Sequence, residues 1–216
     1  LVTPPRPNPI EPMVGTASLI LSAGARHRTE RALLAPALHG QRVRALGTTI
    51  RDAALAELES WYRPGAAAPF DALTMARAIT RRVILAAVFG PGNDRDADYA
   101  NVVSAFLDAF TMPLLVAPVL RREVGGAGPL ARFVAARTRL DRLIRADIAR
   151  RRAHGPGAGD LLDLLLEIRY DDGSALTDRE LCEQLRTLIV AGHETTATTL
   201  TWALYHLHRE PGLLAA

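Results

Sequence analysis

Residues 177–209 read TDRELCEQLRTLIVAGHETTATTLTWALYHLHR, and this stretch decides the fold. No proline interrupts it, and the next proline is Pro211. Thr177 and Glu180 have the spacing of a capping box, in which each side chain accepts a hydrogen bond from the other residue's backbone N–H. We therefore predict one helix of about 32 residues, roughly 48 Å long at 1.5 Å per residue. Because an average globular helix has about 11 or 12 residues, this helix is expected to cross its whole domain.

The rest of the chain also has the pattern of helices. Glycine and proline interrupt it at wide intervals, and between these breaks the apolar residues recur at helical spacing. Three such faces consist of Val43, Leu46, Ile50, Leu58 and Trp61; of Leu73, Val83, Ile84 and Val88; and of Leu130, Phe133, Val134, Leu140, Ile144 and Ile148. Strand signals are almost absent. We predict an all-α, mainly helical chain that forms a single domain over residues 1–216.

Composition narrows the function classes. All 26 basic residues are arginine, but 23 acidic residues leave a net charge of only +3, so we expect no nucleic-acid partner. The single cysteine excludes an internal disulfide framework and is typical of a reducing compartment. No apolar run reaches the roughly 20 residues of a membrane span, so we expect no membrane partner and a cytoplasmic location. Since the chain begins at Leu1 rather than methionine, its natural start is expected upstream.

The long helix loses bulk abruptly in its middle. At 100° per residue, one face carries leucines for two turns and then small or hydroxylated residues, Gly192, Thr195, Thr196 and Thr199. Glycine costs about 1 kcal/mol against alanine inside a helix, and threonine is also a poor helix former. Such a local violation tends to mark a functional site.

We call this group of small and hydroxylated residues, Gly192, Thr195, Thr196 and Thr199, the notch. A structural alternative remains open for it. Small residues allow another helix to pack closely, and threonine hydroxyls can bond back to the carbonyl four residues earlier. The carboxylate of Glu194, adjacent to Thr195, favours a site, because an acid and a hydroxyl together form a short proton relay.

Residues 191–196, A-G-H-E-T-T, resemble the A-G-x-[DE]-T-T motif in the long distal helix of the cytochrome P450 family. The resemblance implies that Ala191 and Gly192 lie against the haem and that Gly192 makes room for dioxygen. It also implies that the Thr195 hydroxyl bonds to the bound dioxygen and that Glu194 supplies protons. Cleavage of the O–O bond needs protons delivered without flooding the site with water.

A second match lies upstream, where His27 and Arg31 form H-x-x-x-R. Their spacing places both side chains on one helical face, and arginine's planar fork suits a carboxylate. The resemblance assigns this pair to the two haem propionates. Leu38 departs from the family pattern, which usually has an aromatic residue near this point.

The resemblance covers nearly the whole chain and implies further expectations. The cofactor would be haem b, and the partners would be dioxygen, a small organic substrate and a ferredoxin- or flavodoxin-type redox partner. The complete protein would be a soluble bacterial monooxygenase that inserts one oxygen atom into its substrate. Helices around residues 98–152 would cover the substrate pocket, where Phe106, Phe110, Met112 and Leu115 are candidates, although core packing is the default for such residues.

The family's iron ligand is a cysteine in a loop that follows an E-x-x-R helix, and neither feature occurs here. Cys182 begins the long helix and lacks that loop context, so we assign no metal ligand in this chain. The fold is expected to be a partial cytochrome P450 domain over residues 1–216, ending just after the long distal helix. We expect this chain to be inactive by itself.

Two rival functions follow from other patterns. His193 and Glu194 begin an H-E-x-x-H zinc motif, but the second histidine would have to stand where Ala197 is, so this hypothesis fails. A helical, ligand-binding transcription regulator suits the length and arginine content. However, the first 25 residues are rich in proline and poor in basic residues, which does not suit a recognition helix. Salt-dependent DNA binding would identify a regulator.

Arginine clusters at residues 121–122 and 150–152 could dock an acidic redox partner. The second cluster ends a predicted helix, where cations also complement the helix dipole.

Overall fold

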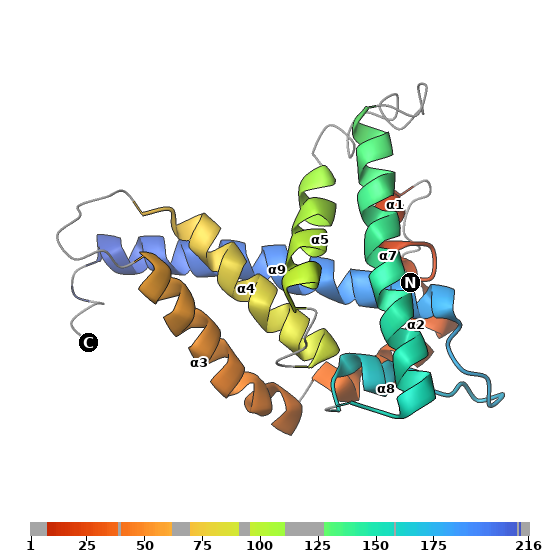
Figure 1. Cartoon of the computed structure of the whole chain (residues 1–216). Helices are drawn as coiled ribbons and strands as arrows, with labels where there is room; N and C mark the ends of the chain where they lie inside the picture. The colour runs from red at the N-terminus through yellow and green to blue at the C-terminus, as the bar shows by residue number, and fades with distance from the viewer. Residues whose placement is uncertain are drawn as a thin grey trace.

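The chain folds almost entirely into helices (Figure 1). The computed structural model describes residues 8–38, 40–61, 70–90, 96–110, 128–157, 159–210 and 212. The elements are α1 (Glu11–Val14), η1 (Leu19–Leu21), α2 (Gly24–Leu34), η2 (Ala35–Leu38), α3 (Gln41–Trp61), α4 (Ala72–Phe89), α5 (Asp96–Ala109), α7 (Pro129–His154), α8 (Leu161–Glu167) and α9 (Asp178–Arg209). In these ranges the only β-type pairing is an isolated bridge between Arg169 and Ala175. The all-α prediction is confirmed.

Helix α9 has the predicted start and length. Thr177 and Glu180 form both hydrogen bonds of the capping box, and the helix then continues for 32 residues. Figure 1 shows α9 in blue, crossing the molecule behind α4, α5 and α7. A single uninterrupted helix therefore connects the two ends of the fold.

Helix α4 forms the most extensive contact with α9 of any element. Asp71 caps its start by accepting hydrogen bonds from the backbone N–H groups of Leu73 and Thr74. The helix ends at Gly90, whose φ of +86° suits a residue without a Cβ. The predicted apolar face is present, because Val88 is fully buried and Ile84 is half-buried in the core. Helix α4 is therefore the wall against which the middle of α9 is packed.

The main core lies where α5 and α7 meet α8 and the first half of α9. Phe106 is fully buried there, which confirms core packing as its role, whereas Met112 and Leu115 lie outside the described residues. The largest fully buried side chains are Tyr99, Phe106, Phe133, Leu140, Ile144, Ile148, Leu162, Leu165, Leu181, Leu185 and Ile189. The predicted apolar face of residues 130–148 thus forms the centre of the core.

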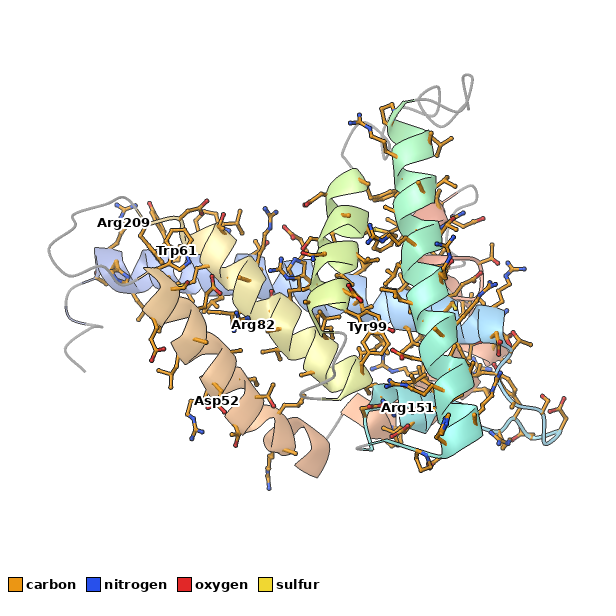
Figure 2. The ribbon with its side chains drawn as sticks, in the orientation of Figure 1. Asp52, Trp61, Arg82, Tyr99, Arg151 and Arg209 are labelled. Atoms are coloured by element: carbon orange, nitrogen blue, oxygen red, sulfur yellow. The ribbon has the colours of Figure 1, made fainter. Side chains whose placement is uncertain are left out.

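The arginine cluster at residues 150–152 is engaged within the chain. Arg151, labelled in Figure 2, is buried and binds the carboxylates of Asp160 and Asp163, and it donates to the Phe89 carbonyl at 3.1 Å. Arg150 and Arg152 form their own ion pairs. The cluster therefore ties α7 to α8, α4 and α9, and this explains it better than docking of a partner. Residues 121–122 lie outside the described residues.

Helix α3 is covered on one side only. Ala53 packs with Met75 and Ile79 of α4 in a small second cluster. Ile50 and Leu58, which share the predicted apolar face, are 44% and 48% exposed. The described residues therefore cover these two side chains only in part.

None of the described helices is both long enough and apolar enough to cross a membrane. The same ranges contain no cluster of three or more histidine, cysteine, aspartate or glutamate side chains arranged to hold a metal ion.

Candidate functional site on the long helix

The notch on α9 forms an open stripe. Ala191, Glu194, Thr195 and Thr199 are exposed, whereas the leucines one to three turns earlier lie in or against the core. Helix α9 thus changes from a buried helix to one with an accessible polar face at the residues that the sequence singled out. A ligand that approaches this face meets small side chains and hydroxyl groups.

Gly192 of α9 packs against Ile84 of α4. A Cβ at this position would be 2.7 Å from Cδ1 of Ile84, closer than real Cβ contacts allow. The glycine therefore has a packing role in the described chain, as the structural alternative expected. Its additional role beside a haem stays a prediction.

The threonine hydroxyls of the notch bond back along the helix. Thr195 Oγ1 donates to the Ala191 carbonyl, and Thr199 Oγ1 donates to the Thr195 carbonyl at 2.9 Å. These bonds satisfy each hydroxyl proton while the lone pairs of each oxygen remain available. Thr195 can therefore accept a hydrogen bond at once and can donate one after its side chain rotates.

Glu194 forms a two-point ion pair with Arg77 of α4. Arg77 Nη2 lies 2.5 Å from Glu194 Oε1, and Arg77 Nε lies 3.1 Å from Oε2. The hydrogen bond to Glu194 raises the pKa of Arg77. Both side chains are about half exposed, so water reaches the carboxylate. Sequence reasoning missed Arg77, because only the packing of α4 against α9 brings it to the notch.

His193 points to the buried side of the same turn. It is 4% exposed, and its Nδ1 lies 3.0 Å from Thr80 Oγ1 on α4. Burial is the main cause that lowers the pKa of His193, so the ring is neutral near pH 7. This contact fixes the rotation of α9 at the notch and leaves Glu194 on the open side.

His27 and Arg31 lie on α2, away from the notch. His27 is half-buried and Arg31 is exposed, and neither forms an ion pair with a described residue. Helix α2 approaches the start of α9, where Arg26 lies 3.9 Å from Glu180. Glu180 precedes Glu194 by 14 residues, or roughly 21 Å along the helix. The structure therefore does not bring the His27–Arg31 pair into contact with the notch.

Cys182 lies in the first turns of α9. Its side chain is 1% exposed, and burial raises the pKa of its thiol. A buried, protonated thiol behaves as a small apolar side chain.

The chain is helical in its described residues, and α9 carries an acid and a hydroxyl on its open face next to a glycine packed against α4. The family model for cytochrome P450 matches residues 5–216, and the chain belongs to the cytochrome P450 family. The predicted family and the partial P450 fold are thereby confirmed, and the transcription-regulator alternative has no support.

Curated mycobacterial proteins are similar over most of this chain. A Mycobacterium tuberculosis protein provisionally named cytochrome P450 138 is 34% identical over 206 residues, which cover 94% of this chain and 46% of that protein. A second, provisionally named cytochrome P450 137, is 31% identical over 95% of this chain and 43% of that protein. The chain thus spans about half the length of the curated relatives it matches.

Solved structures show the same fold. The haem domain of cytochrome P450DA aligns with a TM-score of 0.80 at 24% identity, over 100% of this chain and 47% of that one. The cyanobacterial CYP120A1, solved with retinoic acid bound, aligns with a TM-score of 0.70 at 23% identity, over 87% of this chain and 41% of that one.

Proposed function

We propose that this chain is the distal part of a haem-dependent monooxygenase that inserts one atom of dioxygen into a small organic substrate. The observation that carries the proposal is the open stripe of α9, where Glu194 and Thr195 are accessible beside Gly192. Family membership supports haem b as the cofactor. A ferredoxin- or flavodoxin-type redox partner and a cytoplasmic location belong to the same proposal.

The described residues suit a haem at two places. The open stripe offers small and hydroxylated side chains to a flat ligand, and no described side chain covers Ala191 or Thr195 enough to bury it. Arg31 is exposed and has no carboxylate partner among the described residues, so its guanidinium is available for a propionate. His27 lies one turn earlier on the same face of α2. When bound, the haem would supply the activation of dioxygen.

Thr195 would hold and release a proton at the open face. Its hydroxyl now donates to the Ala191 carbonyl, and rotation of the side chain redirects that proton toward a ligand lying against α9. The helix carbonyl is a ready alternative acceptor, so the hydroxyl is never left without a partner. Thr195 would thus position a proton without an additional buried base.

Glu194 would collect protons from solvent. Its carboxylate is half exposed and is held by Arg77, and opening of this ion pair frees a carboxylate oxygen to take up a proton from water. Because Glu194 and Thr195 are adjacent on the helix, one or two water molecules suffice to connect the carboxylate to the hydroxyl. Arg77 would therefore control when the relay is open.

The test uses the complete enzyme, supplied with electrons and a small organic substrate. Thr195→Ala should keep consuming electrons while product formation falls at least about tenfold, because proton positioning of this kind contributes factors of about 100 or more. Thr201→Ala is the matched control, since that hydroxyl also bonds back to a helix carbonyl but is only half-exposed near the end of α9. Equal losses in both variants, or unchanged coupling in Thr195→Ala, would contradict the proposed role.

A further inference from the structure

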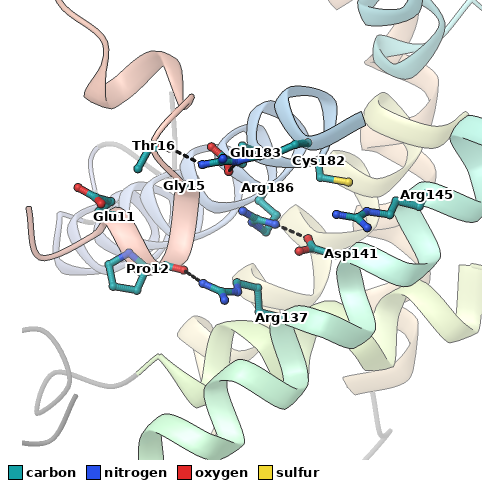
Figure 3. Close-up of a pocket in the computed structure, with 11 residues that line it drawn as sticks. Glu11, Pro12, Gly15, Thr16, Arg137, Asp141, Arg145, Cys182, Glu183 and Arg186 are labelled. Carbon is teal, nitrogen blue, oxygen red and sulfur yellow. Dashed lines mark hydrogen bonds and ion pairs between the residues drawn. The ribbon is translucent and has the colours of Figure 1, made fainter. Parts of the chain in front are cut away.

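We propose that a cavity between α1, α7 and α9 binds a small organic anion through a carboxylate or phosphate group. The cavity has a volume of about 400 Å³, within the range of small-molecule pockets. Figure 3 shows it between the α1 segment and the facing sides of α7 and α9. Its walls consist of Glu11, Pro12, Gly15, Thr16, Arg137, Asp141, Arg145, Arg179, Cys182, Glu183 and Arg186.

The charges around this cavity do not balance. Four arginines face three carboxylates, and two of those carboxylates are already engaged by neighbours within the chain. Asp141 pairs with Arg186, and Glu183 accepts hydrogen bonds from Arg179 at 2.9 Å and from the Ala17 backbone N–H at 2.6 Å. The cavity is therefore left with excess positive charge.

Arg137 is the cation that most needs a counter-ion. Its side chain is half-buried and donates to the Pro12 carbonyl at 2.8 Å, a neutral partner. Burial, followed by the charge of nearby Arg186, lowers the pKa of Arg137. No described carboxylate forms an ion pair with it, and Glu11 pairs with none of the four arginines. The charges of Asp141 and Glu183 offset part of this effect, and the guanidinium lies 5.7 Å from the Phe133 ring centroid. Burial still dominates, so an anion that binds Arg137 directly would stabilise its charge further.

The remaining groups do not supply that anion. Arg145 lies beside Cys182, and its hydrogen bond to the thiol raises the pKa of Arg145. The opposing and larger effect of burial raises the pKa of Cys182, so the thiol stays neutral. Arg137 and Arg145 thus flank the Asp141–Arg186 pair along α7, each without a carboxylate partner of its own. Arginine forks of this kind recognise planar carboxylates and phosphates by paired hydrogen bonds.

This cavity is separate from the notch. Arg186 and Thr195 are nine residues apart on α9, which corresponds to two and a half helical turns and therefore to opposite faces. A ligand in the cavity contacts the first half of α9 and cannot touch the open stripe. The proposed anion site consequently stands independently of the proposed monooxygenase function.

The test titrates the 216-residue chain, without haem, with inorganic phosphate and separately with acetate, at constant ionic strength maintained by sodium chloride. Saturable heat release and a saturable rise in Tm are expected with at least one of the two anions, and the stronger one identifies the preferred group. Arg137→Gln should weaken that binding by about tenfold or more, since a charged hydrogen-bond donor is lost. Arg142→Gln, an exposed arginine of α7 outside the cavity wall, should bind like the unmodified chain.

A second measurement uses Cys182, the single cysteine of the chain, which is part of the cavity wall. Because its side chain is buried, a reagent reaches the thiol only when the surrounding structure opens, and an anion that binds the cavity opposes that opening. The effective anion should slow labelling of Cys182 by iodoacetamide in the unmodified chain and in Arg142→Gln, but not in Arg137→Gln. If Arg137→Gln fails to fold by circular dichroism, Arg145→Gln replaces it, because that side chain is exposed. Absence of saturation with both anions, or equal affinity in the cavity variant and the control, would overturn the proposal.

Discussion

Glu194 of α9 and Arg77 of α4 join two helices through a paired ion contact at the edge of the notch, although 117 residues separate them in the sequence. The pair connects the acid of the sequence motif to a cation that the motif does not contain. Both side chains are about half exposed, so the pair is accessible to water.

The first prediction concerns the strength of this pair. Because both partners are about half exposed, the coupling energy between Arg77→Gln and Glu194→Gln should be below ~1 kcal/mol. A double-mutant cycle measured by urea unfolding gives that energy. A coupling of several kcal/mol would mean that the pair is a fixed structural tie and would exclude its opening during proton uptake.

Gly192→Ala should lose most or all of the gain of about 1 kcal/mol that alanine usually brings inside a helix, because the added methyl group displaces the end of the Ile84 side chain. Gly47→Ala is the matched control, since Gly47 lies in α3 with open space where a Cβ would be, and alanine there should stabilise by up to about 1 kcal/mol. Urea unfolding measures both changes. Combining Gly192→Ala with Ile84→Val should recover part of the lost gain, and failure to recover any would argue against contact with Ile84 as the cause.

Lowering the pH should reduce the free energy of unfolding, because His193 becomes protonated more readily in the unfolded chain. Burial lowers the pKa of His193 in the folded state below its usual 6.5, so the unfolded chain binds a proton that the folded chain resists. This contribution to stability is complete above about pH 6.5 and is lost as the pH falls from there toward the folded-state pKa. The groups that act on the ring besides burial are Glu194, Arg81, Arg77 and Asp108.

The pH dependence of unfolding in His193→Gln tests this point. Between pH 7 and 5 its free energy of unfolding should fall less than that of the unmodified chain. His208→Gln, on the exposed last turn of α9, should follow the unmodified chain. Identical slopes for all three proteins would contradict the assignment.

Arg151 and Arg152, at the end of α7, should contribute very differently to the free energy of unfolding. Arg151→Ala leaves the buried carboxylates of Asp160 and Asp163 without their cation and should cost about 3–5 kcal/mol. Arg152→Ala removes only a half-exposed pair with Asp178 and should cost less than about 1 kcal/mol. Thermal and urea unfolding of the two neighbouring variants make the comparison, and similar losses would show that Arg151 is not the central tie.

The sequence predicted those features that depend only on residues close together along the chain. The capping box of Thr177 and Glu180 and the absence of proline were enough to predict α9, because a cap and an unbroken pattern act within a few residues. The notch was visible for the same reason. Arg77 was not predictable, since its role arises only from the packing of α4 on α9.

Contacts between residues far apart along the chain also explain the other differences between the sequence-based predictions and the structure. Arg151 has the position of a dipole-complementing residue at a helix end, and its burial depends on α8 folding back toward Phe89. The face of α3 has an apolar pattern, but pattern alone does not say what covers it, and Leu58 is 48% exposed.

The start of α9 holds the segment around α1 in an unusual way. Its side chains bind that segment's main chain, with Arg186 donating to the Met13 carbonyl and Gln184 contacting the Ala17 carbonyl and the Leu19 N–H. These main-chain contacts act together with the side chains of Thr16 and Ser18, which accept hydrogen bonds from Arg179 and Thr187 of α9. Because many of these contacts involve the main chain, exposed side chains of the segment such as Ile20 can be substituted without breaking the hydrogen bonds that anchor it to α9.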